Sequence, residues 1–161
     1  MRLFLLRHAI AKNGVPDEAR PLSRSGCGQV ERLCSLINSG MFSGVAQIWH
    51  SPFARAAETA RLFKESAGIA SPLVEFKNMR PSDDPREMAR AVASICVFGG
   101  DLMIVGHNPH LEGLADILLG GAAVYFSNCA LACFELEEMP NIENETGSWS
   151  LSFLLSPNEL C

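Results

Sequence analysis

The sequence predicts a three-layer α/β/α fold built as a single domain over residues 1–161, with a mostly parallel sheet and antiparallel strands at its C-terminal end. Apolar runs of strand length alternate with longer segments whose apolar residues recur at helical spacing, which is the order of β-α-β units. In the last third, apolar and polar residues alternate with period two, which predicts an antiparallel pair. A chain of 161 residues also suits one domain of about 100–200 residues.

The first predicted strand is a continuous apolar run from Leu3 to Leu6, the pattern of a central strand covered on both faces. It ends at two adjacent polar residues, Arg7 and His8. Ligands of open α/β sheets bind outside the carboxyl ends of the strands. Arg7 and His8 are therefore candidate binding residues.

The segment from 9 to 22 is polar and is interrupted by one glycine and two prolines, which predicts a long loop. Loops of this length in compact domains tend to be functional. Apolar residues then recur at helical spacing as far as Ile37, and either Ser23 or Ser25 suits the N-cap of this first helix.

Two further predicted strands, 46–50 and 101–106, are each followed by a residue suited to an N-cap and by a proline. These pairs are Ser51-Pro52 and, one residue after His107, Asn108-Pro109. Helix N-termini attract anions, so we expect Ser51 and Asn108 to help bind a negatively charged substrate.

The remaining elements are also predicted from the spacing of their apolar residues. Residues 73–76 predict a short third strand, and Pro85 opens a helix with apolar residues along one side. The alternating stretches 130–136 and 149–155 predict the antiparallel pair at one side of the sheet.

Composition excludes several classes of protein. Hydrophobic residues make up 48% of the chain and charged ones 19%, as in a globular domain, and the net charge of −5 argues against a nucleic-acid partner. The first apolar run is too short for a signal peptide or a membrane span. Six cysteines without a Cys-x-x-Cys spacing indicate reduced thiols. We expect a cytoplasmic monomer that binds neither nucleic acid nor membrane.

Right-handed crossovers place the carboxyl ends of the first, second and fourth strands at one edge of the sheet. This edge collects Arg7, His8, Arg55 and His107. Arg55 lies on the first turn of a helix, and helical side chains tilt toward the N-terminus, so Arg55 should lean over His8. Nearby cations keep a histidine neutral and free to attack, and they stabilise charge on phosphoryl oxygens. The edge therefore predicts a phosphoryl-transfer site with His8 as nucleophile.

The motifs of this edge resemble those of the histidine phosphatase superfamily. They read Leu6-Arg7-His8-Ala9, Ser51-Pro52-Phe53-Ala54-Arg55-Ala56 and Gly106-His107-Asn108-Pro109. The small size, the stretch Arg20-Pro21-Leu22-Ser23 followed by Gly26, and the closing Ser156-Pro157-Asn158-Glu159-Leu160 are similar to SixA-type phosphohistidine phosphatases.

The resemblance implies that His8 is the nucleophile and that Arg7, Arg55 and His107 are phosphate ligands, with Arg20 as a further ligand. It also implies a phosphohistidine-bearing protein as substrate and phosphate as product. Ala9 departs from the superfamily pattern, which most often has glycine there.

A second departure concerns the general acid. Many relatives carry an acid on an inserted lid for which this chain has no room, and the acids in a comparable stretch are Asp83, Asp84 and Glu87. A phosphate ester expels an alkoxide, whose conjugate acid resembles water with a pKa near ~15.7, whereas phosphohistidine expels an imidazole of pKa near ~6.5. The imidazole leaves without a strong proton donor, which favours a phosphohistidine substrate.

Two alternative functions stay open at this point: a phosphatase or mutase for small phosphate esters, and a non-catalytic module that binds phosphohistidine. We expect no cofactor and no metal. His107 and His110 have a spacing that suggests metal ligation, but Pro109 lies between them and the nearby arginines would repel a cation.

Overall fold

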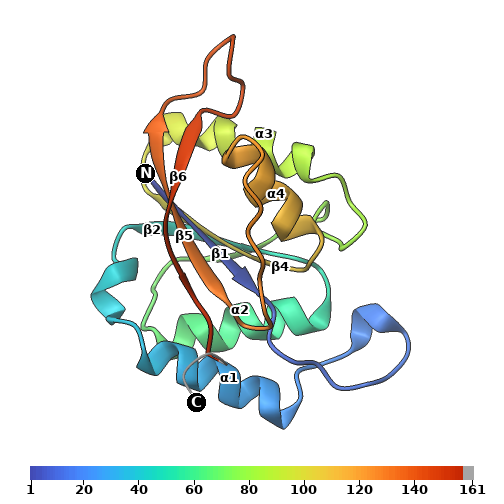
Figure 1. The fold of residues 1–161 in the computed structure, drawn as a ribbon. Coiled ribbons are helices and arrows are strands. Elements are labelled where there is room, and N and C mark those ends of the chain that lie inside the picture. The colour runs from blue at the N-terminus through green and yellow to red at the C-terminus, as the bar shows by residue number, and fades with distance from the viewer. Residues whose placement is uncertain (158–161) are drawn as a thin grey trace.

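A six-stranded sheet with the order β3-β2-β4-β1-β5-β6 forms the centre of the computed structural model, which describes residues 1–157 (Figure 1). The four parallel strands are β1 (Arg2–Arg7), β2 (Val45–His50), β3 (Leu73–Glu75) and β4 (Asp101–Gly106). The antiparallel strands are β5 (Leu131–Glu138) and β6 (Ser148–Leu155). The predicted mixed sheet is confirmed, while Asn158, Glu159 and Leu160 of the closing motif lie outside the described residues.

Helices cover both faces of the sheet, α1 (Arg24–Ser35) and α2 (Ala54–Ser66) on one, and α3 (Pro85–Ile95) and α4 (His110–Leu118) on the other (Figure 1). Short 3-10 helices are η1 (Asp17–Ala19), η2 (Ser39–Phe42) and η3 (Cys96–Phe98). In β1, Phe4 and Leu6 pack with α1 and α2, whereas Leu3 and Leu5 pack with α3 and α4. The three predicted layers therefore arise because side chains alternate along an entirely apolar strand.

The predicted N-caps Ser51 and Asn108 do not cap helices. α2 begins at Ala54 and α4 at His110, and neither helix has a side-chain cap. The Ser51 hydroxyl bonds instead to a histidine ring, and the Asn108 amide to a carbonyl and a carboxylate. The histidine is His107 and the carbonyl is that of Phe126, both from other elements, so tertiary contacts take the place of the expected capping bonds.

The predicted long loop, residues 9–22, leaves the carboxyl end of β1 and contains η1 (Figure 1). Its two ends are held together by a bridge between Ala11 and Leu22. The loop is also fastened to the start of α1, because the Ile10 carbonyl accepts hydrogen bonds from the backbone amide and the hydroxyl of Ser23. Of the two residues that suited the N-cap, Ser23 and Ser25, Ser23 is the N-cap in the structure.

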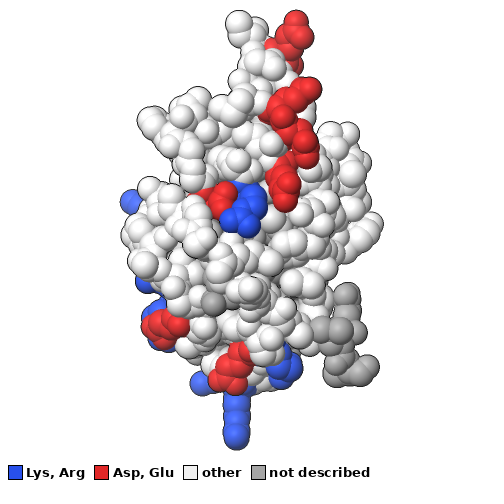
Figure 2. Space-filling model, turned by 90° about the vertical axis from the view of Figure 1, so that its left-hand side faces the viewer, with Lys and Arg blue, Asp and Glu red and all other residues white. Residues whose placement is uncertain are grey.

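Charge is distributed unevenly along the chain. All thirteen Lys and Arg residues lie between Arg2 and Arg90. Exposed glutamates follow on β5 and on the β5–β6 connection, and Figure 2 shows acidic side chains toward the top of one face of the molecule. Lysine and arginine side chains that serve a site must therefore come from the first 90 residues of the chain.

Two observations bear on the environment of the protein. Within residues 1–157, no helix combines the length and the apolar character needed to cross a membrane. The five cysteines in this range form no disulfide.

Gly26 should be required for attachment of the loop to α1. A Cβ at this buried position would lie 2.1 Å from the Ile10 carbonyl oxygen. We expect Gly26→Ala to lower the free energy of unfolding by about 1–3 kcal/mol, because the backbone must shift to relieve the overlap. Gly28→Ala is the control, since a Cβ there meets only the end of the Arg32 side chain at 3.4 Å. Urea unfolding of both variants measures the difference, and equal stabilities would contradict it.

Candidate active site

The carboxyl ends of β1, β2 and β4 are held side by side by backbone hydrogen bonds. The amide of His8 donates to the Gly106 carbonyl at 2.9 Å, and the amide of Ser51 donates to the Val105 carbonyl at 3.1 Å. A cavity of about 580 Å³ opens beside these strand ends. It is lined by Arg7, His8, Ile10, Ala11, Asn13, Asp17, Arg20, Arg55, Pro81, Asn108 and Asn128.

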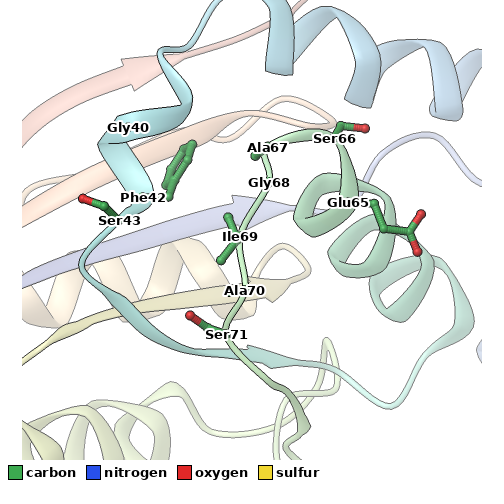
Figure 3. A pocket seen from close by; sticks show the side chains of 10 residues that line it. All are labelled: Gly40, Phe42, Ser43, Glu65, Ser66, Ala67, Gly68, Ile69, Ala70 and Ser71. Carbon is green, nitrogen blue, oxygen red and sulfur yellow. The ribbon is translucent and has the colours of Figure 1, made fainter.

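A second cavity, of about 520 Å³, lies between η2 and the segment that follows α2 (Figure 3). Its lining contains one ionisable side chain, Glu65, whose carboxylate pairs with Arg61. Small and apolar residues make up the rest of the wall. Of these two cavities, the first therefore has the larger set of ionisable side chains in its wall.

His8 is held in one orientation and one tautomer. Its Nδ1 lies 2.8 Å from the Ala9 carbonyl, and because a carbonyl only accepts, Nδ1 carries the proton. Nε2 then keeps its lone pair. Burial and, to a smaller extent, the charges of Arg55, Arg7 and Arg20 together lower the pKa of His8 to about 4, against the hydrogen bond to Ala9, which raises it. His8 is therefore neutral at pH 7, and its Nε2 is an unprotonated nitrogen that accepts a hydrogen bond from Arg55 Nε.

Arg55 leans back from the first turn of α2 toward His8, as its position on the helix predicted. Its Nε lies 3.3 Å from His8 Nε2, and its guanidinium carbon lies 4.9 Å from the centre of the Phe53 ring. Thr59, one turn later, donates to the Arg55 carbonyl and accepts from the Ala9 amide at 3.1 Å. Thr59 thereby fixes α2 to the residue that follows His8.

Arg7 is anchored at one nitrogen and unpaired at another. Its Nη1 donates to the Phe126 carbonyl at 2.7 Å, whereas its buried Nε has no partner. Asn108 Nδ2 donates to the same carbonyl at 2.9 Å and to Glu112 at 2.7 Å, and Asn108 Oδ1 is buried without a partner. Arg7 and Asn108 both line the cavity, and Arg7 has a donor left for an anion.

His107 is buried next to His8 and is not among the residues that line the cavity. The two imidazole rings are 4.9 Å apart, and Nε2 of His107 is 2.7 Å from the Ser51 hydroxyl. Burial and, to a smaller extent, His8 and Arg55 together lower the pKa of His107 to about 3. Ser51 is fully buried as well and does not line the cavity. Its hydroxyl therefore contacts His107 and is not placed to contact a ligand in the cavity directly.

Asp17 is a site residue that sequence reasoning missed. Its carboxylate accepts from Arg20 at 2.7 Å and from Arg55 at 3.1 Å, and its backbone carbonyl accepts from Arg55 at 2.8 Å. The hydrogen bond from Arg20 is the largest cause that lowers the pKa of this carboxyl. Asp17 thus occupies an anion position between two predicted phosphate ligands. Asp17 lies in a polar loop, and no pattern in the sequence around it indicates a role in the site.

Asn128 and Phe126 were missed for a similar reason. Asn128 lines the cavity and donates to the His8 carbonyl at 3.2 Å, while Phe126 contributes only its backbone carbonyl. Both lie in the connection between α4 and β5, more than a hundred residues from His8 in sequence. No local pattern points to contacts at that separation.

The predicted acids Asp83 and Asp84 act as local hydrogen-bond acceptors. Asp83 accepts from the Arg80 amide at 2.7 Å, and Asp84 caps α3 by accepting from the Arg86 amide at 2.9 Å. Neither lines the cavity, although Pro81 of the same loop does. A role as proton donor stays a prediction. Across residues 1–157, no cluster of three or more His, Cys, Asp or Glu side chains could hold a metal ion.

Comparisons with known proteins place the fold. No protein-family model and no curated protein matches the sequence. Solved structures match over nearly the whole chain. The protein histidine phosphatase SixA complexed with tungstate matches at a TM-score of 0.86, with 22% identity and 100% of both chains covered. A candidate phosphohistidine phosphatase SixA from Agrobacterium tumefaciens matches at 0.78, with 22% identity and 98% of both chains covered.

Small-molecule phosphatases share the architecture. A mycobacterial glucosyl-3-phosphoglycerate phosphatase, in complex with VO3, matches at a TM-score of 0.67, with 17% identity, 94% of this chain and 97% of that chain covered. The chain therefore has the histidine phosphatase fold, which confirms the fold expected from the motifs. Within that fold it is similar over its whole length to SixA. Its reaction must be argued from its own site.

We expect His8 to remain neutral and reactive at pH values where an ordinary imidazole is protonated, because its pKa is lowered to about 4. Between pH 7.5 and 5.5, the neutral fraction of a free imidazole with a pKa near 6.5 falls about tenfold. The rate at which diethyl pyrocarbonate modifies the His8 peptide should stay nearly constant over this range, as followed by mass spectrometry. A tenfold fall at His8 would contradict the assignment. Circular dichroism checks that the fold persists.

We expect Asp17→Asn to strengthen binding of tungstate, because the variant removes a carboxylate that competes for Arg20 and Arg55. Because the lost ion pairs are partly exposed, the affinity for tungstate should rise by roughly three- to tenfold. Titration calorimetry measures this affinity. Glu18→Gln is the matched control, since it makes the same charge change one residue away, and the Glu18 carboxylate contacts neither arginine. Weaker binding by Asp17→Asn, or an equal gain in both variants, would overturn this reading.

Proposed function

We propose that this chain is a phosphohistidine phosphatase that hydrolyses phosphohistidine on a protein through a covalent intermediate on His8, without a metal. The observation that supports this most is the neutral His8, with Nε2 unprotonated, in a cavity also lined by Arg7, Arg20 and Arg55. An uncharged nucleophile among three cations is suited to a negatively charged electrophile.

The reaction proceeds in two displacements. Nε2 of His8 attacks phosphorus, the bond from phosphorus to the substrate imidazole breaks, and that imidazole takes a proton from solvent. Water then attacks phosphorus on His8, so that inorganic phosphate leaves and His8 is regenerated. The arginines stabilise the charge that spreads over the equatorial oxygens in both steps.

The acids around the cavity favour a substrate with an easy leaving group. Asp83 and Asp84 do not line it, and Asp17, which does, is ion-paired with a lowered pKa and is a poor proton donor. An alkoxide needs such a donor, whereas imidazole leaves without one because its conjugate acid has a pKa near ~6.5. Phosphohistidine therefore fits this site better than a phosphate ester does.

The surroundings of the cavity favour a protein substrate. From β2 to the start of α3, the described chain contains only α2, the short strand β3 and their connecting loops, and Pro81 is the residue of this stretch outside α2 that lines the cavity. A side chain presented on another protein can therefore approach His8. The second candidate is hydrolysis of small phosphate esters, which the shared fold of the glucosyl-3-phosphoglycerate phosphatase supports.

Turnover of a labelled phosphohistidine protein tests the proposal. Denaturation in alkali during turnover should trap label on the peptide that contains His8, because a phosphoramidate survives base. His8→Ala should abolish both label and turnover. Arg55→Ala should lower the rate on the order of 10²–10³-fold, since it removes one preorganised donor. Arg61→Ala is the control on the same helix, where the side chain is exposed and pairs with Glu65.

Other outcomes separate the alternatives. Label on His107 with an active His8→Ala variant would overturn the nucleophile assignment. Loss of activity on chelation and its recovery with zinc or magnesium would overturn metal independence. A faster reaction with sugar phosphates that Asp83→Asn or Asp84→Asn abolishes would establish the small-ester enzyme instead. Binding without phosphate release would leave only a recognition module.

A further inference from the structure

Ser51 has the closest polar contact to the second histidine of the site. It is fully buried at the carboxyl end of β2, and its Oγ lies 2.7 Å from His107 Nε2. The backbone amide of Phe53 donates to the same oxygen at 3.3 Å. These two groups are the partners of the Ser51 hydroxyl in the described chain.

The partners determine the direction of the hydrogen bond. A hydroxyl has one proton to donate, and the Phe53 amide cannot accept it. If His107 Nε2 were protonated, it would donate to Oγ, and the Ser51 proton would be buried without an acceptor. The arrangement that leaves no hydroxyl proton unpaired has Ser51 donating to a bare Nε2.

A bare Nε2 places the ring proton of His107 on Nδ1. The ring is neutral at pH 7, because burial lowers the pKa of His107 to about 3, and a neutral imidazole carries one N–H. Nδ1 is buried and has no partner, although the His107 ring lies 4.9 Å from the ring of His8. An unpaired buried donor is costly to maintain, and its presence next to a nucleophile points to a ligand that is absent from the resting site.

His8 and His107 thus have the same tautomer but different hydrogen-bond partners, which prepare them for opposite roles. His8 Nδ1 faces an acceptor, the Ala9 carbonyl, so its Nε2 is unprotonated and accepts a hydrogen bond from Arg55 Nε at 3.3 Å. His107 Nε2 accepts from the Ser51 hydroxyl, so the proton of the His107 ring lies on Nδ1, which has no partner. One histidine is prepared to attack phosphorus and the other to donate to an oxygen.

We propose that Ser51 is a positioning residue that fixes His107 as the Nδ1–H tautomer, so that His107 meets the phosphoryl group on His8 as a hydrogen-bond donor. The inference rests on the proposed function for the identity of the anion. The tautomer itself follows from the contacts of Ser51 and is independent of turnover.

Nitrogen-15 NMR of histidine-labelled protein tests this inference directly. Two-bond correlations distinguish a protonated Nδ1 from a protonated Nε2, and the His107→Asn spectrum assigns the His107 signals. In the wild-type protein we expect a protonated Nδ1 and a bare Nε2 at pH 7. A protonated Nε2 would overturn the proposal without the need for any variant.

Variants then test the role of the hydroxyl. Ser51→Ala should give a mixture of the two tautomers at His107 and bind tungstate about tenfold more weakly, whereas Ser51→Thr, which keeps the hydroxyl, should restore both properties. Ser71→Ala is the control, because Ser71 donates to the Val45 carbonyl at the opposite end of β2. An unchanged tautomer and affinity in Ser51→Ala would overturn the inference. Absence of turnover in a protein with the expected tautomer would overturn only the proposed function.

Discussion

The position of β1 between β4 and β5 is the constraint on which the site depends. β1 pairs in parallel with β4 and antiparallel with β5, and the pairing extends one residue beyond the strand to His8. Its amide donates to Gly106 and its carbonyl accepts from Cys129. His8 is therefore clamped from both sides by backbone. In the mechanism that we propose, a nucleophile held in this way needs no reorganisation before attack, which is where preorganised sites gain their rate.

The site gathers positive charge in a protein whose net charge is −5. Arginines that converge repel one another, and burial adds a desolvation cost, so carboxylates must offset part of the charge. Asp17 does so between Arg20 and Arg55, and Glu112 interacts favourably with Arg7. The two acids differ in their position relative to the cavity. Glu112 sits behind Asn108 in the wall, whereas Asp17 lines the cavity and occupies a place that an incoming anion needs.

Packing next to His8 explains why His107 is neutral. His107 is buried between the rings of His8 and Phe53, and Arg55 lies over the same Phe53 ring. A charged imidazolium at this buried position would be poorly solvated and would lie close to the cation of Arg55. The ring of Phe53 thus contributes indirectly, because it helps to bury His107 and so favours its neutral form.

The sequence by itself determined the elements and the edge where the site lies. Continuous apolar strands and helical spacing gave the layers, and the tilt of helical side chains gave the contact between Arg55 and His8, because these depend on periodicity and local geometry. Only the tertiary structure decided what the polar side chains bind. Ser51 suits an N-cap by its neighbours, yet it contacts His107 from another strand, and Asp17 resembles any solvated loop residue until Arg20 and Arg55 surround it. His107, Arg20 and Arg55 come from other elements, and the pattern of one segment cannot show which polar groups of other elements the fold brings against it.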